Sequence, residues 1–147
     1  MEKLTYSVEI SANPERVWQI LWTDETYRKW TKPFHETSYA ESDWNEGSEI
    51  LFLTEGGDGM YSVIEKKIPN EYISYKHVGM LKNGEKTPFD KDGADWTGGV
   101  ESYRLEKENG KTLLTAETDS VEEYKDFFAE KFPQALGLVK SLAEESD

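Results

Sequence analysis

The stretch VEEYKDFFAEKFPQALGLVKSL, residues 121–142, decides the fold of this chain. Its apolar residues recur at intervals of three and four, which is the period of one face of an α-helix. Phe128, Phe132, Leu136 and Val139 share that face, and we expect all four to be buried against the concave face of a sheet. A helix of about 22 residues is roughly 33 Å long. The chain before this helix is rich in strand signals. We therefore predict an α+β fold in which a curved antiparallel sheet wraps around the helix and leaves a cavity between them.

The predicted sheet begins at the N-terminus. Leu4, Tyr6, Val8 and Ile10 alternate with polar residues, which is the period-two pattern of a half-buried strand. Turn signals rich in glycine and asparagine separate the later strands, and short turns between consecutive strands favour antiparallel pairing. We expect these later strands over residues 48–53, 60–68, 72–79, 101–106 and 112–118.

Two short helices are predicted between the first strand and the rest of the sheet. Asn13 is a good N-cap residue, Pro14 suits the first helical position, and Glu15 favours the positive end of the helix dipole. A second helix is expected to start at Thr23 or Asp24 and to end before Pro33, which disfavours helix in the residue before it. The order is therefore β-α-α, then strands, then one long helix.

Composition limits the kind of protein. The chain has 147 residues, enough for one domain over residues 1–147, and it has no cysteine for disulfides or thiolate metal sites. No apolar run approaches the roughly 18 residues of a membrane span. With 17 basic and 30 acidic residues, the net charge of −13 repels phosphate backbones and anionic lipid heads. We expect a cytoplasmic protein that binds neither nucleic acid nor membranes.

Five short motifs occur in an order that resembles one known superfamily. They are Asn13-Pro14-Glu15-Arg16-Val17-Trp18, the strand after Gly47, Lys67-Ile68-Pro69, Gly110-Lys111-Thr112-Leu113-Leu114-Thr115 and Phe132-Pro133-Gln134-Ala135-Leu136. Together they resemble the START-related (SRPBCC) helix-grip proteins, and the nearest branch looks like the homologues of the activator of the 90-kDa heat-shock protein ATPase. The resemblance implies a cavity between sheet and helix. Members of the superfamily bind sterols, lipids, plant hormones or polyketides there, and a few catalyse cyclisation or hydrolysis.

Strand parity places a few polar side chains in the expected cavity. On the strand 72–79, Lys76 marks one face as solvent, so Tyr75 and His77 should point inward. On the strand 101–106, Glu101 and Tyr103 share the inward face. A carboxylate, an imidazole and two phenols over an apolar floor would orient a hydrophobic ligand with a polar tip. The expected ligand-binding residues are Phe52, Tyr75, His77, Trp96, Glu101, Tyr103, Phe128 and Phe132.

Several interpretations of these residues stay open. Glu101 and His77 lie near strand ends, so they could be solvated, form a hydrogen-bonded pair, or act as an acid–base pair. The aromatic residues could be ordinary core. Residues 80–98 form a polar insertion that could be a mobile lid carrying Trp96, or Trp96 could be a plug that seals the core.

The sequence carries no pattern for a metal or a cofactor. His35 and His77 are the only histidines and have no metal-ligand spacing, and the serines lack a positioned base. We therefore expect binding of a small hydrophobic molecule, lipid-like, aromatic or polyketide-like. The alternatives are an enzyme that uses His77 or Glu101 on an aromatic or polyketide-like substrate, or a module that interacts with a chaperone in a stress response. A homodimer is possible on this reading.

Overall fold

The computed structural model describes residues 1–89 and 96–145 of the chain. The strands are β1 (Glu2–Ile10), β2 (Tyr39–Glu41), β3 (Glu49–Leu53), β4 (Gly59–Ile68), β5 (Tyr72–Lys82), β6 (Glu85–Thr87), β7 (Val100–Glu108) and β8 (Lys111–Ser120). The helices are α1 (Pro14–Trp22), α2 (Asp24–Trp30), the short 3-10 turn η1 (Glu122–Tyr124) and α3 (Lys125–Glu144).

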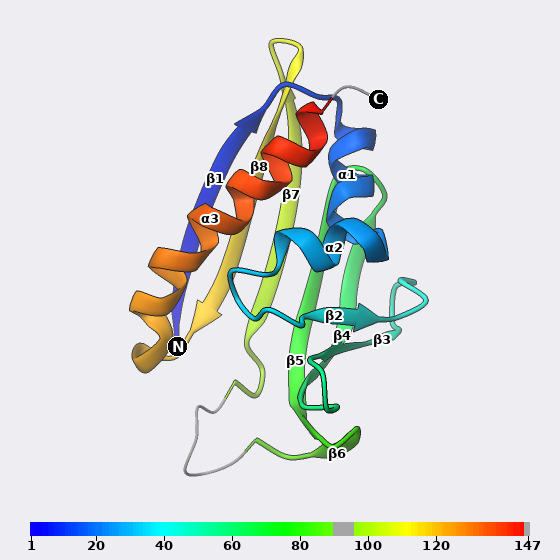
Figure 1. Cartoon of the computed structure of the whole chain (residues 1–147), viewed down its shortest axis with the longest axis vertical. Helices are drawn as coiled ribbons and strands as arrows, with labels where there is room; N and C mark the ends of the chain where they lie inside the picture. The colour runs from blue at the N-terminus through cyan, green and yellow to red at the C-terminus, as the bar shows by residue number, and fades with distance from the viewer. Residues whose placement is uncertain (90–95, 146–147) are drawn as a thin grey trace.

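The strands form one antiparallel sheet with the order β1-β8-β7-β5-β4-β3-β2, and β6 pairs with β5. Helix α3 crosses the face formed by β1, β8 and β7, while α1 and α2 lie beside it over the neighbouring strands (Figure 1). The predicted helix-grip architecture is confirmed, with two short helices after the first strand. Among the described residues, no helix is long and apolar enough to cross a membrane.

The apolar face of α3 is packed as its spacing predicts, with one exception. Phe132, Leu136 and Val139 are buried, and the Phe132 ring stacks on Tyr6 with 4.9 Å between ring centroids. Phe128 was expected in the core but is only partly buried. It lies near the N-terminal end of α3, where the helix borders a cavity rather than the packed core. The helix therefore anchors the fold through its middle and C-terminal turns.

The first helix starts where the sequence predicts, and the last one does not. Asn13 Oδ1 accepts a hydrogen bond from the Arg16 backbone N–H at 2.8 Å, and Pro14 occupies the first turn of α1. The α-helix predicted from residue 121 begins only at Lys125. Val121 still has extended backbone, and no side chain caps the turn that follows it. Without a cap, that turn tightens into the 3-10 turn η1.

The prediction of an irregular insertion over residues 80–98 is wrong for the first part of this segment. Strand β5 continues to Lys82, and Asn83 and Gly84 turn the chain into β6. Both turn residues have positive φ, at 53° and 82°, as a two-residue hairpin turn requires. The lid predicted over residues 80–98 stays a prediction, and residues 90–95 of that segment lie outside the described residues. Strands β2 and β6 were missed because three residues are too few to show an alternation.

Two β-bulges shift the register between β4 and β5. Ser62 lies opposite His77, and Val78 is the extra residue on β5 at this shift. Glu65 is the extra residue on β4 at a second shift a few residues away, so the strands pair in the same register at both ends. The shift therefore affects only the segment between the bulges. It places the Ser62 side chain directly beside His77.

Two glycine substitutions test the packing of this fold, and we expect them to change the free energy of unfolding in opposite directions. A Cβ on Gly59 would fall onto the Phe52 carbonyl oxygen of β3, so we expect Gly59→Ala to destabilise the protein by about 1–3 kcal/mol. Gly137 lies within α3 and has open space around it, so Gly137→Ala should stabilise the protein by about 0.5–1 kcal/mol. Urea denaturation of both variants measures the two changes. A Gly59→Ala protein as stable as wild type would contradict the close approach of β3 and β4.

Candidate functional site

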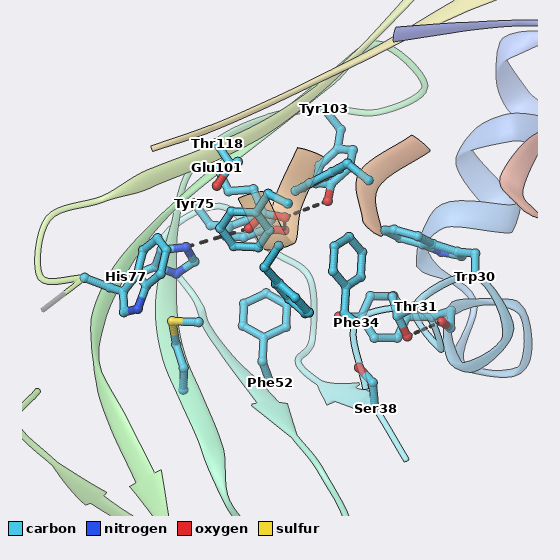
Figure 2. A pocket seen from close by; sticks show the side chains of 16 residues that line it. Trp30, Thr31, Phe34, Ser38, Phe52, Tyr75, His77, Glu101, Tyr103 and Thr118 are labelled. Atoms are coloured by element: carbon cyan, nitrogen blue, oxygen red, sulfur yellow. Dashed lines mark hydrogen bonds and ion pairs between the residues drawn. The ribbon is translucent and has the colours of Figure 1, made fainter. Parts of the chain in front are cut away.

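A cavity of about 190 Å³ lies between the inner face of the sheet and helices α2 and α3. Its walls are mostly aromatic, and its ionisable side chains Glu101 and His77 lie with Thr118 where β5, β7 and β8 meet, whereas Thr31 and Ser38 lie at the wall near α2 (Figure 2). The lining residues are Tyr27, Trp30, Thr31, Phe34, Ser38, Phe52, Met60, Tyr75, His77, Trp96, Glu101, Tyr103, Thr118, Phe127, Phe128 and Phe132. An apolar cavity with a few convergent polar groups is the usual form of a small-molecule site.

Every residue predicted for the site lines this one cavity. The structure brings Phe52 from β3, Trp96 from the segment before β7, and Phe128 and Phe132 from α3 to the same space as the predicted residues of β5 and β7. That they contact a ligand stays a prediction. The sequence reasoning missed the lining residues from α2, from the loop after it and from three other elements, which are Tyr27, Trp30, Thr31, Phe34, Ser38, Met60, Thr118 and Phe127.

Glu101 is the centre of the polar end of the cavity. The hydroxyl groups of Tyr75 and Tyr103 both donate to Glu101 Oε2, at 2.7 Å and 2.6 Å. Figure 2 shows the carboxylate between the two phenols and the imidazole of His77. The Glu101 side chain is only 19% exposed, so the alternative of a solvated residue at the strand end is wrong. The carboxylate is instead held by two charge-assisted hydrogen bonds.

The two phenols stay protonated in this environment. Burial raises the pKa of Tyr75 and of Tyr103 well above the ordinary value, and the nearby charge of Glu101 raises both further. Burial also raises the pKa of Tyr27, which lines the same cavity. Each phenol is therefore a permanent hydrogen-bond donor at any physiological pH.

His77 is buried at the other side of the carboxylate. Its Nδ1 lies 2.7 Å from Ser62 Oγ, and its Nε2 lies 3.7 Å from Glu101 Oε1. The second distance is too long for a hydrogen bond, so the predicted hydrogen-bonded pair of His77 and Glu101 is wrong. The two phenols take that role instead. Burial lowers the pKa of His77, against the opposing effect of Glu101, so the imidazole is neutral near pH 7.

Ser62 resembles a nucleophile next to a base, but its position argues against that role. The expectation that no serine has a positioned base is wrong for this residue, because its hydroxyl contacts the His77 ring. Ser62 is 0% exposed, and it does not line the cavity. A substrate in the cavity would therefore not reach its oxygen. Ser62 acts on the site through His77, as its hydrogen-bond partner.

We expect His77 to make the stability of the protein pH-dependent below its ordinary pKa of 6.5. Because burial lowers the pKa in the folded state, the unfolded chain takes up the proton first as the pH falls. The contribution of neutral His77 to the free energy of unfolding is thus complete above pH 6.5. It is lost as the pH falls from there toward the lower pKa of the folded state. In this range, the free energy of unfolding of wild type should fall more steeply with decreasing pH than that of His77→Gln, by up to roughly 1.4 kcal/mol per pH unit.

Denaturant unfolding of wild type and His77→Gln at several pH values measures that difference. Parallel stability curves for the two proteins would contradict a buried neutral imidazole. The chain has two histidines, so a His35→Gln variant allows the His77 ring to be titrated alone by NMR. Its midpoint should lie below 6.5.

A second hollow of about 550 Å³ adjoins the cavity and leads outward; we call it the vestibule. The cavity and the vestibule share Ser38, Phe52, Met60, Trp96, Phe127 and Phe128 as lining residues. Trp96 packs on Phe128 and Tyr124, with ring centroids 5.7 Å and 5.5 Å apart. Trp96 therefore stands at the border between the two spaces. In residues 1–89 and 96–145, no group of three or more His, Cys, Asp or Glu side chains could hold a metal ion.

Comparison with known proteins places this chain in a family. Among similar solved structures, the Aha1 dimer from Colwellia psychrerythraea is 26% identical, with a TM-score of 0.72 over 98% of this chain and 97% of that chain. Protein MLL2253 from Mesorhizobium loti is 16% identical, with a TM-score of 0.78 over 99% of both chains. CalU16 from Micromonospora echinospora is 15% identical, with a TM-score of 0.66 over 97% of this chain and 76% of that chain. The last two show the fold alone.

No curated protein sequence matches the chain significantly. The family model described as Activator of Hsp90 ATPase homolog 1-like protein matches residues 11–144, which is nearly the whole chain. The branch of the START-related superfamily that the motifs resemble is confirmed by this match. The chain belongs to the family of Activator of Hsp90 ATPase homolog 1-like proteins.

Proposed function

We propose that this protein binds a small hydrophobic molecule with a polar tip in the cavity between the sheet and α3. The observation that carries the proposal is the combination of mostly aromatic walls with a charged, hydrogen-bonded group at Glu101. An apolar cavity of about 150 Å³ can hold benzene. A cavity of about 190 Å³ therefore has room for one ring, and the vestibule can take an apolar tail.

Analysis of the purified protein tests this proposal directly. Native mass spectrometry should detect a co-purified molecule, and extraction should identify it as a neutral or weakly polar hydrophobic compound. A thermal-shift screen with aromatic and aliphatic compounds should raise the melting temperature of wild type. Failure of every compound to shift wild type, together with an empty protein in native mass spectrometry, would refute the proposal.

A pair of variants on one helix makes the screen specific for the cavity. Phe128 lines both the cavity and the vestibule, whereas Leu138 is exposed on the same helix. Phe128→Ala should change the ligand-induced shift, because it removes part of the wall that the ligand contacts. Leu138→Ala is the matched control and should leave that shift as in wild type. Equal effects of the two variants would place binding outside the cavity.

An enzymatic function is the second candidate. It is favoured by one observation, that the Glu101 carboxylate and the His77 imidazole both face the cavity and lie 3.7 Å apart. Two groups at this spacing could exchange a proton with a bound aromatic or polyketide-like substrate. Incubation of the protein with its co-purified molecule, followed by mass spectrometry, tests for turnover. An unchanged compound after long incubation would leave binding as the function.

The comparisons suggest two further partners for the chain. The family is named after activation of the Hsp90 ATPase, and the Colwellia relative is described as a dimer. A chaperone contact and a homodimer are thus candidates for this chain as well. Hsp90 ATPase rates with and without the protein test the first, and light scattering after size exclusion tests the second.

A further inference from the structure

We propose that the polar end of the cavity is a clamp for one hydroxyl group, formed by Glu101 Oε1 and His77 Nε2. The ligand class would then be neutral phenols or ring alcohols, and ligands with a carboxylate or an ammonium group would be disfavoured. This inference rests on the proposed ligand binding and names the chemical class of the ligand. It follows from which atoms of the two side chains are already occupied.

The acceptor of the clamp is one oxygen of Glu101. Tyr75 and Tyr103 both donate to Oε2, so that oxygen already has two hydrogen bonds. Among the described residues, Oε1 accepts no side-chain hydrogen bond, and its near neighbour is the His77 ring. Because Glu101 lines the cavity, this oxygen is the one available to a ligand donor.

The donor of the clamp is the Nε2–H group of His77. The Ser62 hydroxyl is fully buried, and His77 Nδ1 is the one hydrogen-bond partner that the described residues give it. A buried hydroxyl proton needs an acceptor, so Ser62 donates and Nδ1 accepts. In a neutral imidazole the proton must then be on Nε2. Ser62 therefore fixes the tautomer that presents an N–H to Glu101.

The spacing of these two atoms suits a single oxygen between them. Nε2 and Oε1 are 3.7 Å apart, too far for a direct hydrogen bond. An oxygen placed to one side of the line between them can be about 2.8 Å from both. A hydroxyl group at this point donates to Oε1 and accepts from Nε2–H, because it combines both functions on one atom.

Charge excludes a ligand carboxylate, and the lack of an acceptor disfavours a ligand ammonium. Of the residues that line the cavity in the described part of the chain, none is a lysine or an arginine. A ligand carboxylate would meet the carboxylate of Glu101 without a counter-charge, in a largely apolar space. A ligand ammonium has no lone pair to accept from Nε2–H. A hydroxyl is the tip that satisfies both atoms without bringing a charge into the cavity.

Four compounds that share one methyl-substituted ring test the clamp. Calorimetry should show that 4-methylphenol binds about ten- to a hundredfold more tightly than toluene, because its hydroxyl bonds to a charged group. 4-Methylbenzoate and 4-methylbenzylamine should bind more weakly than 4-methylphenol. Equal affinities for 4-methylphenol and toluene would overturn the clamp and leave the proposed binding intact. Tighter binding of the acid or the amine would also overturn the clamp. Failure of all four compounds would overturn the clamp as well, while native mass spectrometry and the thermal-shift screen would still decide the proposed function.

The tautomer provides a test that needs no ligand. Long-range ¹H–¹⁵N NMR spectra should show the His77 proton on Nε2 in wild type, and a proton on Nδ1 would overturn the proposal. Ser62→Ala should remove this preference and reduce the affinity ratio of 4-methylphenol to toluene. Ser74→Ala, a buried serine on β5 that does not line the cavity, is the matched control and should change neither. An unchanged ratio in Ser62→Ala would refute the positioning role.

Discussion

Truncation of Phe132 to alanine should lower the free energy of unfolding by about 3–5 kcal/mol. The Phe132 side chain is 2% exposed and lies where α3 meets the sheet. It stacks on Tyr6 of β1 with nearly parallel rings, at an interplanar angle of 7°, and it also packs on Phe34 with 4.9 Å between ring centroids. Its removal would leave a hole between three separate parts of the chain, which backbone adjustment cannot close easily.

Urea denaturation of Phe132→Ala measures this loss, with Leu138→Ala as the matched control. Leu138 is on the same helix but is exposed, so its truncation should change stability by no more than roughly 0.5 kcal/mol. Phe132 also lines the cavity, and its truncation should enlarge the ligand space. A loss below about 1 kcal/mol for Phe132→Ala would be inconsistent with α3 as the element that holds the sheet together.

The substitution Glu101→Gln should weaken binding of 4-methylphenol by about ten- to a hundredfold and leave toluene binding unchanged. Glutamine has nearly the same shape, and its amide oxygen can still accept from Tyr75 and Tyr103. Its amide nitrogen would then occupy the place of Oε1, where it presents a donor in place of an acceptor. The lost hydrogen bond to a charged group is worth roughly 1.5–3 kcal/mol, which gives that change in affinity.

Calorimetric titration of wild type and Glu101→Gln with both compounds decides this prediction. Glu106→Gln is the control for loss of charge, because Glu106 is on the same strand but exposed. Circular dichroism should show that both variants keep the fold. If Glu101→Gln binds 4-methylphenol as tightly as wild type does, the carboxylate takes no part in recognition of the hydroxyl.

Much of the fold was predictable because its local signals agree with its packing. Alternation along β1, the Asn13 cap of α1 and the apolar spacing of α3 each correspond to an observed element. Strand parity was equally informative for the site. It placed Tyr75 and Glu101 on one inward face, and the structure joins them by a hydrogen bond across adjacent strands.

The rest of the site depends on tertiary packing, which no local pattern reports. Trp30 and Phe34 reach the cavity because α2 folds over the sheet, and their spacing alone is equally consistent with ordinary core. Ser62 was missed for a different reason. Its contact with His77 depends on a shift of register between β4 and β5, and the alternation of either strand alone does not reveal the shift.

The two β-bulges between β4 and β5 have a consequence for how this family can change length. Val78 adds one residue to β5, Glu65 adds one to β4, and the two additions cancel outside the segment between them. Because each extra residue has no partner on the other strand, loss of either one would remove its own bulge and leave all the other pairs in place. Ser62 would still lie opposite His77 after either loss or after both. In an alignment of relatives, gaps at these two positions should therefore occur independently of each other, and members with such gaps should keep the serine–histidine contact.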